Sequence, residues 1–362
     1  MISQSAVEAA IRSYQDPYLK QDLLALGAVK EVKVEGAAVR VTIRLAYPSK
    51  GLQGAMRELL IHAIEDVAGV ESVTVEIDQQ IQPHAVQSQI AALPGVKNVI
   101  AVASGKGGVG KSTVTVNLAL ALQREGARVG ILDADIYGPS QGMMLGVAEG
   151  VRPGVKDEKF FIPVEAHGLQ VMSMAFLTTD KTPVVWRGPM VSGALLQMAT
   201  QSIWNNLDYL LIDMPPGTGD IQLTLAQKIP VTGAIVVTTP QDIALLDCRR
   251  GIEMFSKVSI PVLGIVENMS VHVCSHCGHA EPIFGEEGGA QIAGEYDVPL
   301  LGQVPLHRTI REQTDGGLPS VAAEPDSEVS RRFGDMARHL GALLSLRKVD
   351  QAQLFTDLIG KG

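Results

Sequence analysis

Aromatic residues and cysteines are scarce in this sequence, and each shortage narrows what the chain can be. Aromatic residues account for 4% of the 362 residues, so the core must consist mainly of Val, Ile, Leu, Ala and Met. Aliphatic cores of this kind suit parallel sheets covered by helices, whose strands contain continuous apolar runs. The chain has three cysteines, which are better interpreted as thiols or metal ligands than as a disulfide framework.

The chain also lacks an excess of positive charge and a long apolar run. Its formal net charge is −9, whereas a nucleic-acid-binding protein needs a basic surface to displace counterions. No apolar run of about 18 residues is present to cross a bilayer. Residues 1–17 have neither the basic start nor the apolar stretch of a signal peptide. We therefore expect a cytoplasmic protein with no nucleic-acid and no membrane partner.

The pattern of apolar residues predicts two domains. Residues 1–80 show helical and alternating strand patterns, which predict a small α+β domain. Residues 81–96 are polar and contain Pro83 and Pro94, so we place a linker there. Residues 97–362 form the larger domain, in which aliphatic strands alternate with helices. This alternation implies an α/β fold with a mainly parallel twisted sheet and helices on both faces. Its predicted strands are Val99–Ala103, Val129–Leu132, Tyr209–Ile212, Ala234–Thr238, Val262–Val266 and Leu300–Val304.

A glycine-rich loop follows the first strand of the larger domain. It matches the phosphate-loop (P-loop) pattern in the required place, between a strand and a helix. Glycines let backbone N–H groups approach phosphate oxygens, and the helix that follows adds its positive dipole. A glycine-rich turn without a ligand is the disfavoured alternative, so we predict an ATP site. The predicted loop residues are Gly105, Lys106, Gly107, Gly108, Val109, Gly110, Lys111 and Ser112.

Two lysines of this loop have different expected tasks. Lys111 can reach the β- and γ-phosphates, and the Ser112 hydroxyl beside it can coordinate Mg²⁺. Lys106 would point away from its own triphosphate and could reach a phosphate on a facing subunit, as an arginine finger does in trans. The alternative for Lys106 is a solvated surface lysine.

Three aspartates are candidates for the metal and the attacking water. Asp213 ends an aliphatic strand in the Walker B manner and can hold Mg²⁺ through water. Residues 214–220 then form a Pro- and Gly-rich loop that could sense the γ-phosphate. Asp133 is a candidate for the metal shell, and Asp135 for orienting the attacking water. Aspartates after strands also cap helices, but the accompanying P-loop favours the functional interpretation.

Cys274 and Cys277 form a Cys-x2-Cys pair whose two sulfurs can bind one metal or one cluster edge. Tetrahedral sites need four ligands, which leaves two explanations. A symmetric dimer could hold one cluster between two such pairs, or nearby histidines could complete a zinc site within one chain. A thioredoxin-like redox pair is a third option, although the surroundings lack its βαβ context. Cys248, within a predicted helix, is interpreted as a small buried hydrophobe.

The P-loop, the segments DADIYGPS, DYLLIDMPPGTGD, TTPQD and ENMS, and the Cys-x2-Cys pair occur in this order. Together they resemble the Mrp/ApbC-type iron–sulfur cluster carrier ATPases, a MinD/ParA-like P-loop family with a deviant Walker A motif. The resemblance covers nearly the whole chain, and residues 1–80 resemble a small domain found with iron–sulfur assembly factors.

The resemblance implies a homodimer that binds ATP and Mg²⁺, hydrolyses ATP slowly, holds a [4Fe–4S] cluster between its subunits and passes it to apo iron–sulfur proteins. It also implies assembly factors as partners. The roles that it implies are a trans-acting lysine at Lys106, phosphate and Mg²⁺ contacts at Lys111, Ser112 and Thr113, a water-positioning carboxylate at Asp135, the Walker B acid at Asp213, an adenine contact at Asn268, and cluster ligands at Cys274 and Cys277.

Rival interpretations come from neighbouring P-loop families. A MinD- or ParA-type spatial-organising ATPase would act on a membrane or DNA, but the acidic charge disfavours DNA. The C-terminal stretch Leu354–Ile359 is short and poor in Lys and Arg for a membrane-binding helix. A nitrogenase-iron-protein-like reductase uses widely separated cysteines, unlike this local pair. A zinc-bearing ATPase scaffold remains an alternative. Arg187 is a candidate for either a dimer interface or a structural role.

Overall fold

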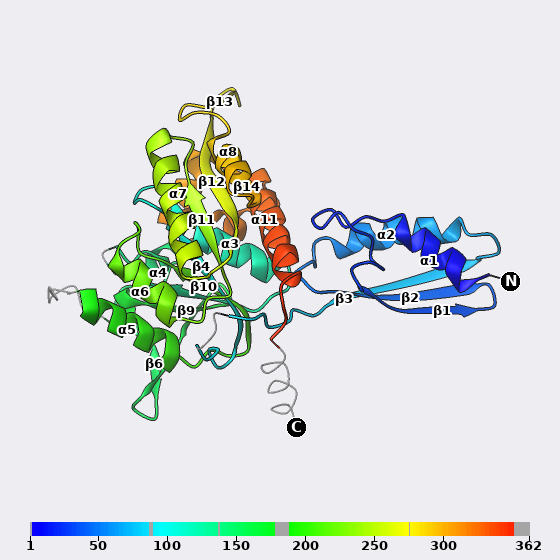
Figure 1. The fold of residues 1–362 in the computed structure, drawn as a ribbon, viewed down its shortest axis with the longest axis horizontal. Coiled ribbons are helices and arrows are strands. Elements are labelled where there is room, and N and C mark those ends of the chain that lie inside the picture. The colour runs from blue at the N-terminus through cyan, green and yellow to red at the C-terminus, as the bar shows by residue number, and fades with distance from the viewer. Residues whose placement is uncertain (1, 87–89, 137, 178–187, 275, 351–362) are drawn as a thin grey trace.

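The computed structural model describes residues 2–86, 90–136, 138–177, 188–274 and 276–350, and shows an elongated N-terminal part beside a larger body (Figure 1). Arg187 and the stretch Leu354–Ile359 lie outside the described residues. No helix among the described residues is both long and apolar enough to cross a membrane.

The N-terminal part packs two helices on one face of a sheet that has three strands within residues 2–86. Its elements are α1 (Gln4–Arg12), β1 (Val29–Glu35), β2 (Ala38–Leu45), α2 (Gln53–Glu65) and β3 (Ser72–Gln79). The hairpin between β1 and β2 turns at Gly36, whose φ of 64° suits glycine. Every second residue of β2 is buried, which directs one face of the strand towards the helices. The predicted small α+β fold is confirmed.

The larger body contains a nine-stranded sheet within the described residues, in the order β13-β12-β11-β4-β10-β5-β9-β8 with β14 also paired to β12. Pairs within it are parallel except those of β8 and β13. The predicted mainly parallel sheet is therefore confirmed. Its strands are β4 (Val96–Ala103), β5 (Val129–Asp133), β8 (Val164–Ala166), β9 (Leu169–Ser173), β10 (Leu207–Asp213), β11 (Gly233–Thr238), β12 (Val262–Val273), β13 (Ala280–Glu281) and β14 (Leu300–Leu306).

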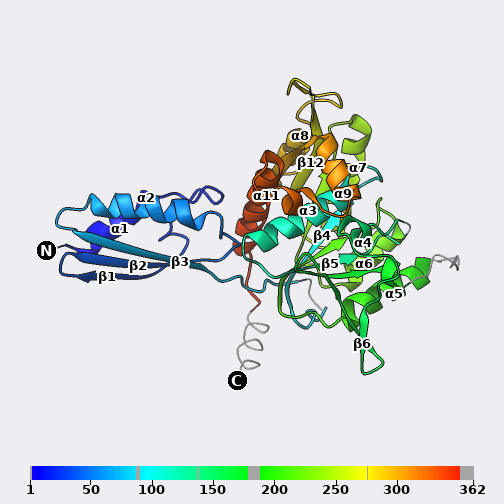
Figure 2. The ribbon, with the colours of Figure 1, turned by 180° about the vertical axis from the view of Figure 1, so that it is seen from behind.

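Helices cover both faces of this sheet (Figures 1 and 2). Ile100 and Val102 of β4 face one apolar core, and Val99 and Ala101 face the other. A strand buried on both sides must be apolar at every position, which explains its continuous aliphatic run. One face carries α3 (Lys111–Arg124) and α11 (Glu328–Ser345); the other carries α5 (Gly188–Gln201), α6 (Asp220–Lys228), α7 (Asp242–Lys257) and α8 (Gly288–Glu295).

Short elements connect the larger ones. The sequence predicted none of those between residues 141 and 176, because each is too short to show a period. They are α4 (Gln141–Met144), the hairpin of β6 (Gly154–Lys156) and β7 (Phe160–Ile162), and a 3₁₀ turn at Met174–Phe176; α9 (Arg308–Asp315) and α10 (Ser320–Ala323) lie further along. Strand β12 is longer than the predicted Val262–Val266, because its last residues pair with β13.

The first part of the predicted linker, residues 81–86, is anchored to the larger body. Lys97 Nζ donates a hydrogen bond to the carbonyl of Ile81, and Asn98 Nδ2 donates one to that of Gln82. The buried His84 donates its backbone N–H to Asn98 Oδ1 at 3.1 Å. The chain leaving the small sheet is therefore held against the start of β4 and is not a free tether here.

The small sheet docks where α3 ends. The carbonyl of Glu125 accepts hydrogen bonds from Lys50 N and Gln79 Nε2, and its carboxylate accepts one from Gly51 N at 2.7 Å. Arg338 of α11 pairs with the same carboxylate at 2.5 Å. Glu125 therefore joins the N-terminal part to the two helices that cover one face of the main sheet.

We expect Arg338→Ala to lower the free energy of unfolding by about 3 kcal/mol, because it leaves the buried carboxylate of Glu125 without its cation. The two side chains are only 15% and 6% exposed. Arg332→Ala is the matched control on the same helix: its partner Glu328 is exposed, so the expected loss is below about 0.5 kcal/mol. Urea unfolding measures both losses, and equal losses would contradict the assigned docking role.

Candidate functional site

The predicted P-loop lies between the carboxyl end of β4 and the first turn of α3. Gly108 and Gly110 have φ values of 82° and 81°, a conformation that favours glycine. A Cβ atom on Gly110 would lie 2.1 Å from Asn268 Nδ2, so a larger residue does not fit. The loop borders a cleft of about 210 Å³. The cleft is lined by Ser104, Gly107, Gly108, Gly110, Lys111, Ser112, Thr113, Asp135, Ser140, Met144 and Pro216.

Lys111 lies at the centre of a buried charged cluster. Its Nζ is 2.5 Å from Asp213 Oδ1, 3.8 Å from Asp135 Oδ2 and 3.3 Å from Ser112 Oγ. Thr115 Oγ1 also donates to Asp213 Oδ1, at 3.2 Å. The structure thus brings together three segments that were predicted separately, namely the P-loop, the segment of Asp135 and the strand that ends at Asp213. A phosphate group that takes the lysine must replace the carboxylate as its partner.

Asp133 lies beside Asp213, because β5 and β10 pair in parallel with these two residues in register. Its carboxylate accepts hydrogen bonds from Gln141 N, Ser173 Oγ and Asp135 N. Burial, and next the charge of Asp213, raise the pKa of Asp133 to about 7. These contacts hold the backbone that carries Asp135, and the predicted metal-shell role of Asp133 stays a prediction.

Asn268 and Lys106 were both predicted to contact nucleotide, one at the adenine and one at the partner's phosphates. Asn268 is buried in β12, and its Nδ2 donates a hydrogen bond to the carbonyl of Val109 at 2.9 Å. It therefore braces the P-loop, and its adenine contact stays a prediction. Lys106 is partly exposed and is not among the residues that line the cleft. A side chain outside its own cleft is what a trans-acting lysine requires, and that role also stays a prediction.

Gln141 is a site residue that sequence reasoning missed. Its side chain is fully buried and donates from Nε2 to Asp213 Oδ2 at 2.8 Å and to the carbonyl of Ser112 at 3.1 Å. The only sequence signal was its position, directly after the segment that carries Asp133 and Asp135.

The cysteine pair lies in the turn between β12 and β13, at the far end of the hairpin (Figure 1). Cys274 is half-buried and Cys277 is exposed. Hydrogen bonds from the backbone N–H groups of Cys277 and His276, and then from the Cys277 side chain, hold the pKa of Cys274 below its usual range. Within the described part of the chain, no three His, Cys, Asp or Glu side chains are grouped as a metal site.

Cys248 behaves as predicted. It is buried in α7, and burial raises the pKa of its thiol to about 12. A neutral buried thiol is not a metal ligand, which leaves Cys274 and Cys277 as the accessible thiols.

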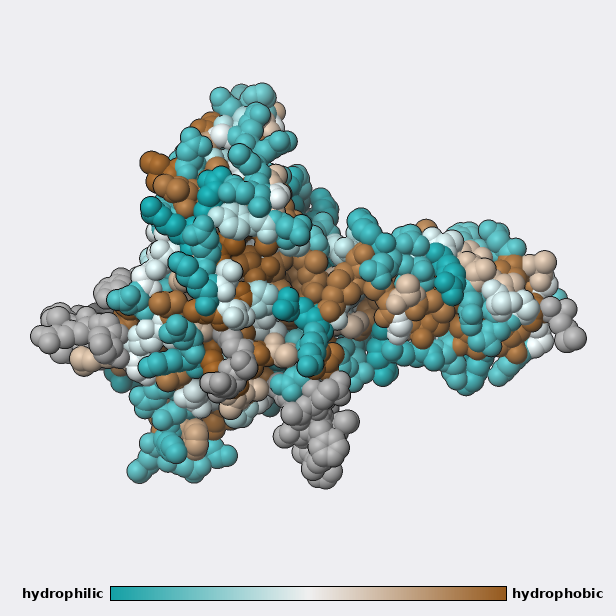
Figure 3. Space-filling view, viewed as in Figure 1, coloured by the Kyte–Doolittle hydropathy of each residue, from teal (hydrophilic) through white to brown (hydrophobic). Residues whose placement is uncertain are grey.

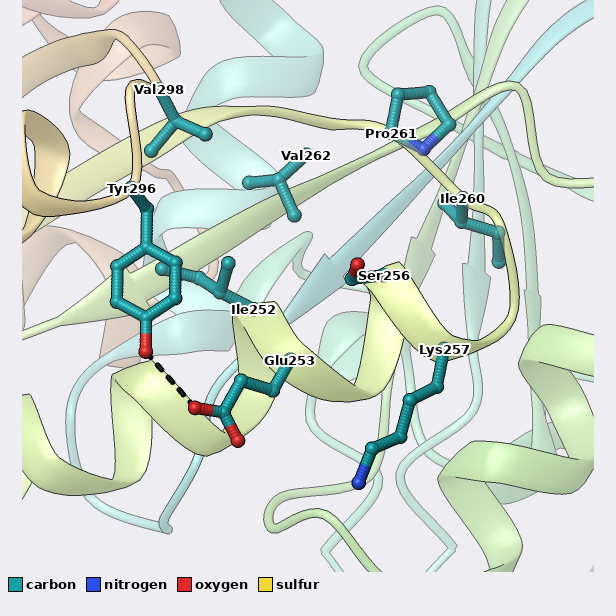
Figure 4. Close-up of a pocket in the computed structure, with 9 residues that line it drawn as sticks. All are labelled: Ile252, Glu253, Ser256, Lys257, Ile260, Pro261, Val262, Tyr296 and Val298. Atoms are coloured by element: carbon teal, nitrogen blue, oxygen red, sulfur yellow. Dashed lines mark hydrogen bonds between the residues drawn. The ribbon is translucent and has the colours of Figure 1, made fainter.

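A second cavity, of about 460 Å³, lies at the end of the parallel strands opposite to the P-loop, and its lining residues are drawn in Figure 4. It opens where α7 ends and β12 begins, whereas the P-loop follows the carboxyl end of the parallel strand β4. Its lining is mainly apolar, with Tyr296 donating a hydrogen bond to Glu253 across one side. Sequence reasoning did not find it, and it is remote from the charged cluster.

Comparison with known proteins agrees with this geometry. Residues 95–341 match the family described as NUBPL iron-transfer P-loop NTPase, and residues 4–77 match the family described as iron-sulfur cluster assembly protein. The first match spans more than half of the chain. This chain belongs to the iron-transfer P-loop NTPases. It is therefore a P-loop NTPase, as the resemblance predicted.

Two relatives carry the name iron-sulfur cluster carrier protein, which is the family that the sequence resembles. The iron-sulfur cluster carrier protein of Pseudomonas fragi is 65% identical over 279 residues, covering 77% of this chain and 97% of that protein. That of Haemophilus influenzae is 49% identical over 341 residues, covering 94% and 92%.

Solved structures agree on the fold of this iron-transfer NTPase. A nucleotide-binding protein from Archaeoglobus fulgidus in complex with ADP matches with a TM-score of 0.57 and 36% identity, over 66% of this chain and 93% of that one. The MinD cell division ATPase of Pyrococcus furiosus, at 24% identity and a TM-score of 0.50 over 67% and 98%, shows the fold alone.

In the unmodified chain, the free energy of unfolding should fall between pH 5 and pH 8. We expect this fall to be about 2 kcal/mol smaller in Asp133→Asn. The raised pKa means that folded Asp133 keeps a proton that the unfolded chain releases above pH 4, so its contribution falls as pH rises. Urea unfolding at both pH values measures the change.

Asp208→Asn is the control, because the pKa of Asp208 is shifted downwards whereas that of Asp133 is shifted upwards. Burial would raise the pKa of Asp208, but hydrogen bonds from Arg128 and Lys97 outweigh it and hold the pKa low. Its loss should destabilise the chain at pH 7. A pH dependence unchanged by Asp133→Asn would show that the folded carboxyl is already ionised at pH 5.

Proposed function

We propose that this chain is an ATP-dependent carrier that holds a [4Fe–4S] cluster between two subunits and transfers it to apo iron–sulfur proteins. The observation that carries the proposal is the turn at Cys274 and Cys277, which presents two sulfurs at the tip of a hairpin with one pKa held low. Soft thiolates are the donors that iron–sulfur clusters require, usually four per [4Fe–4S] centre. Two chains supply four thiolates, so the cluster would be bound between the two subunits and later transferred.

An apolar surface supports a second copy of this chain as the partner. Ile243 and Leu246 in the first turns of α7 are 71% and 49% exposed, and apolar side chains are visible at the upper end of that helix (Figure 3). This helix adjoins the P-loop, because a Cβ on Gly105 would lie 2.2 Å from the carbonyl oxygen of Asp247. A homodimer closed at this edge would cover the apolar residues and place Lys106 opposite the partner's phosphates.

The nucleotide site supports slow hydrolysis that depends on both subunits. Asp135 lies 3.8 Å from the Lys111 ammonium, which supports a role in orienting the attacking water once the lysine turns to the phosphates. The site also fits Mg²⁺, since the buried side-chain oxygens of Ser140 and Gln141 have no hydrogen-bond partner among the described residues. Asp213 and Ser112 would hold the ion, which neutralises charge on the phosphates.

The remaining assignments follow from this carrier role. We propose that residues 1–80 are a docking domain for assembly factors and apoproteins, that residues 81–96 join it to the ATPase domain of residues 97–362, and that the carrier works in the cytoplasm. A reducing compartment keeps the two exposed-loop thiols available for iron. A zinc-bearing scaffold is the second candidate, favoured only by the exposed histidines beside the cysteines.

We expect Cys274→Ala to abolish cluster retention. Anaerobic reconstitution of the unmodified chain should give a dimer with about four iron and four sulfide, and the variant should give neither while still binding ATP. Cys248→Ala is the matched control and should keep its cluster, because that thiol is buried. One zinc per monomer, with no uptake of iron, would establish the zinc scaffold instead.

We expect Lys106→Ala to lower ATP hydrolysis by at least about a hundredfold while nucleotide affinity stays within about threefold, because a trans-acting cation serves the partner's site. Mixing this variant with Lys111→Ala should restore activity. The mixed dimer pairs an intact P-loop lysine on one subunit with Lys106 on the other. Chains that carry both substitutions are the control. No recovery on mixing would place Lys106 in its own site.

A further inference from the structure

Gln141 joins three segments of the nucleotide site. Its backbone N–H donates to Asp133 Oδ2 at 3.1 Å, at the end of β5. Its side-chain nitrogen donates to Asp213 Oδ2 at the end of β10 and to the carbonyl of Ser112 in the first turn of α3. One fully buried side chain thus contacts the carboxylate and the P-loop residue expected to hold Mg²⁺.

The orientation of the Gln141 amide follows from its partners. Asp213 Oδ2 and the Ser112 carbonyl are both acceptors, so the amide must direct its NH₂ group towards them. Its Oε1 is then left buried with no hydrogen-bond partner among the described residues, and so is Oγ of the preceding Ser140, which lines the cleft. A buried polar atom without a hydrogen bond lowers the stability of the fold. Two such atoms in neighbouring residues beside the P-loop indicate that a bound ligand or its water supplies the missing hydrogen bonds.

The two oxygens of Asp213 have different partners. Oδ1 accepts from Lys111 and Thr115, whereas Oδ2 accepts from Gln141. When phosphate takes Lys111, the carboxylate keeps its position through Thr115 and Gln141. Oδ1 would still accept from Thr115 and would have its second lone pair available for a water bound to Mg²⁺.

We propose that Gln141 is a positioning residue for Mg²⁺: its NH₂ group fixes Asp213 and Ser112, and its Oε1 accepts a hydrogen bond from a water of the metal shell. This inference rests on the nucleotide use proposed above. A purely structural Gln141 would set the stability of the fold, whereas a positioning residue sets how much Mg²⁺ the nucleotide complex needs.

The test titrates Mg²⁺ into the full chain with a fluorescent ADP analogue, after measuring affinity for that analogue in EDTA. Gln141→Met keeps the length of the side chain and removes both amide functions. It should leave the affinity in EDTA within about threefold and raise the midpoint concentration of Mg²⁺ by about tenfold. Gln303→Met is the matched control. The Gln303 amide donates a 2.6 Å hydrogen bond to the buried Glu267, and neither residue lines the cleft. The Mg²⁺ midpoint of this variant should equal that of the unmodified chain.

Gln141→Glu gives a pH-dependent version of the same test. A buried glutamate beside Asp133 and Asp213 has a raised pKa, and only its neutral form can donate to Asp213 Oδ2 as the amide does. Its midpoint should therefore approach that of the unmodified chain as pH falls from 8 to 6, with the unmodified chain measured at each pH.

The outcomes separate this inference from the proposed function. Failure of the unmodified chain to bind the analogue in either condition would overturn the nucleotide use itself. Normal binding with an unmoved midpoint in folded Gln141→Met would overturn the positioning role alone. If Gln141→Met does not fold, the pH dependence of Gln141→Glu decides, and a midpoint that follows the unmodified chain at every pH overturns the role.

Discussion

The buried ion pair between Lys111 and Asp213 is the interaction on which the arrangement of the candidate nucleotide site depends. It joins the P-loop to the central strand β10, and both side chains are almost fully enclosed. Removing one partner of such a pair is strongly destabilising, because the other charge stays buried. A phosphate that withdraws the lysine must therefore be accompanied by a cation or donor for Asp213. Gln141, Thr115 and the proposed Mg²⁺ would meet that requirement, and charge balance would then couple the binding of nucleotide to that of metal.

Helix α3 connects the P-loop to the N-terminal part of the chain. Helix α3 begins at Lys111 and ends at Arg124, and its 14 residues span roughly 21 Å. Glu125, directly after it, accepts hydrogen bonds from the small domain and pairs with Arg338 of α11. One rigid element thus has the phosphate site at its start and the docked domain at its end. Any shift of α3 on nucleotide binding acts on both.

Local motifs were predictable from the sequence, and long-range contacts were not. The P-loop, the Walker B strand and the paired cysteines are short patterns whose chemistry requires a fixed spacing. Gln141 was missed because its function depends on Asp213, 72 residues away. The docking of Glu125 with Arg338 likewise joins residues that are 213 positions apart. The cavity in Figure 4 has no motif, because it is a gap between apolar residues of ordinary type. The positions of the longer helices and strands followed from periodicity, whereas β9, α9 and the elements of four residues or fewer were not predicted.

Strand β12 offers a direct link between nucleotide and cluster. Asn268 on this strand holds the carbonyl of Val109 in the P-loop, and Cys274 follows six residues later, about 20 Å along an extended chain. Between them, Met269 has a φ of 56°, and the register with β14 shifts. A left-handed non-glycine residue within a strand persists only where its surroundings impose it. This irregular point lies between the residue that contacts the P-loop and the cysteine hairpin, so a change at the Asn268 contact would meet it before it reached the cysteines. If the proposed cluster binds at these cysteines, its control by ATP would need no contact between the two ligands, because β12 carries Asn268 and leads to Cys274.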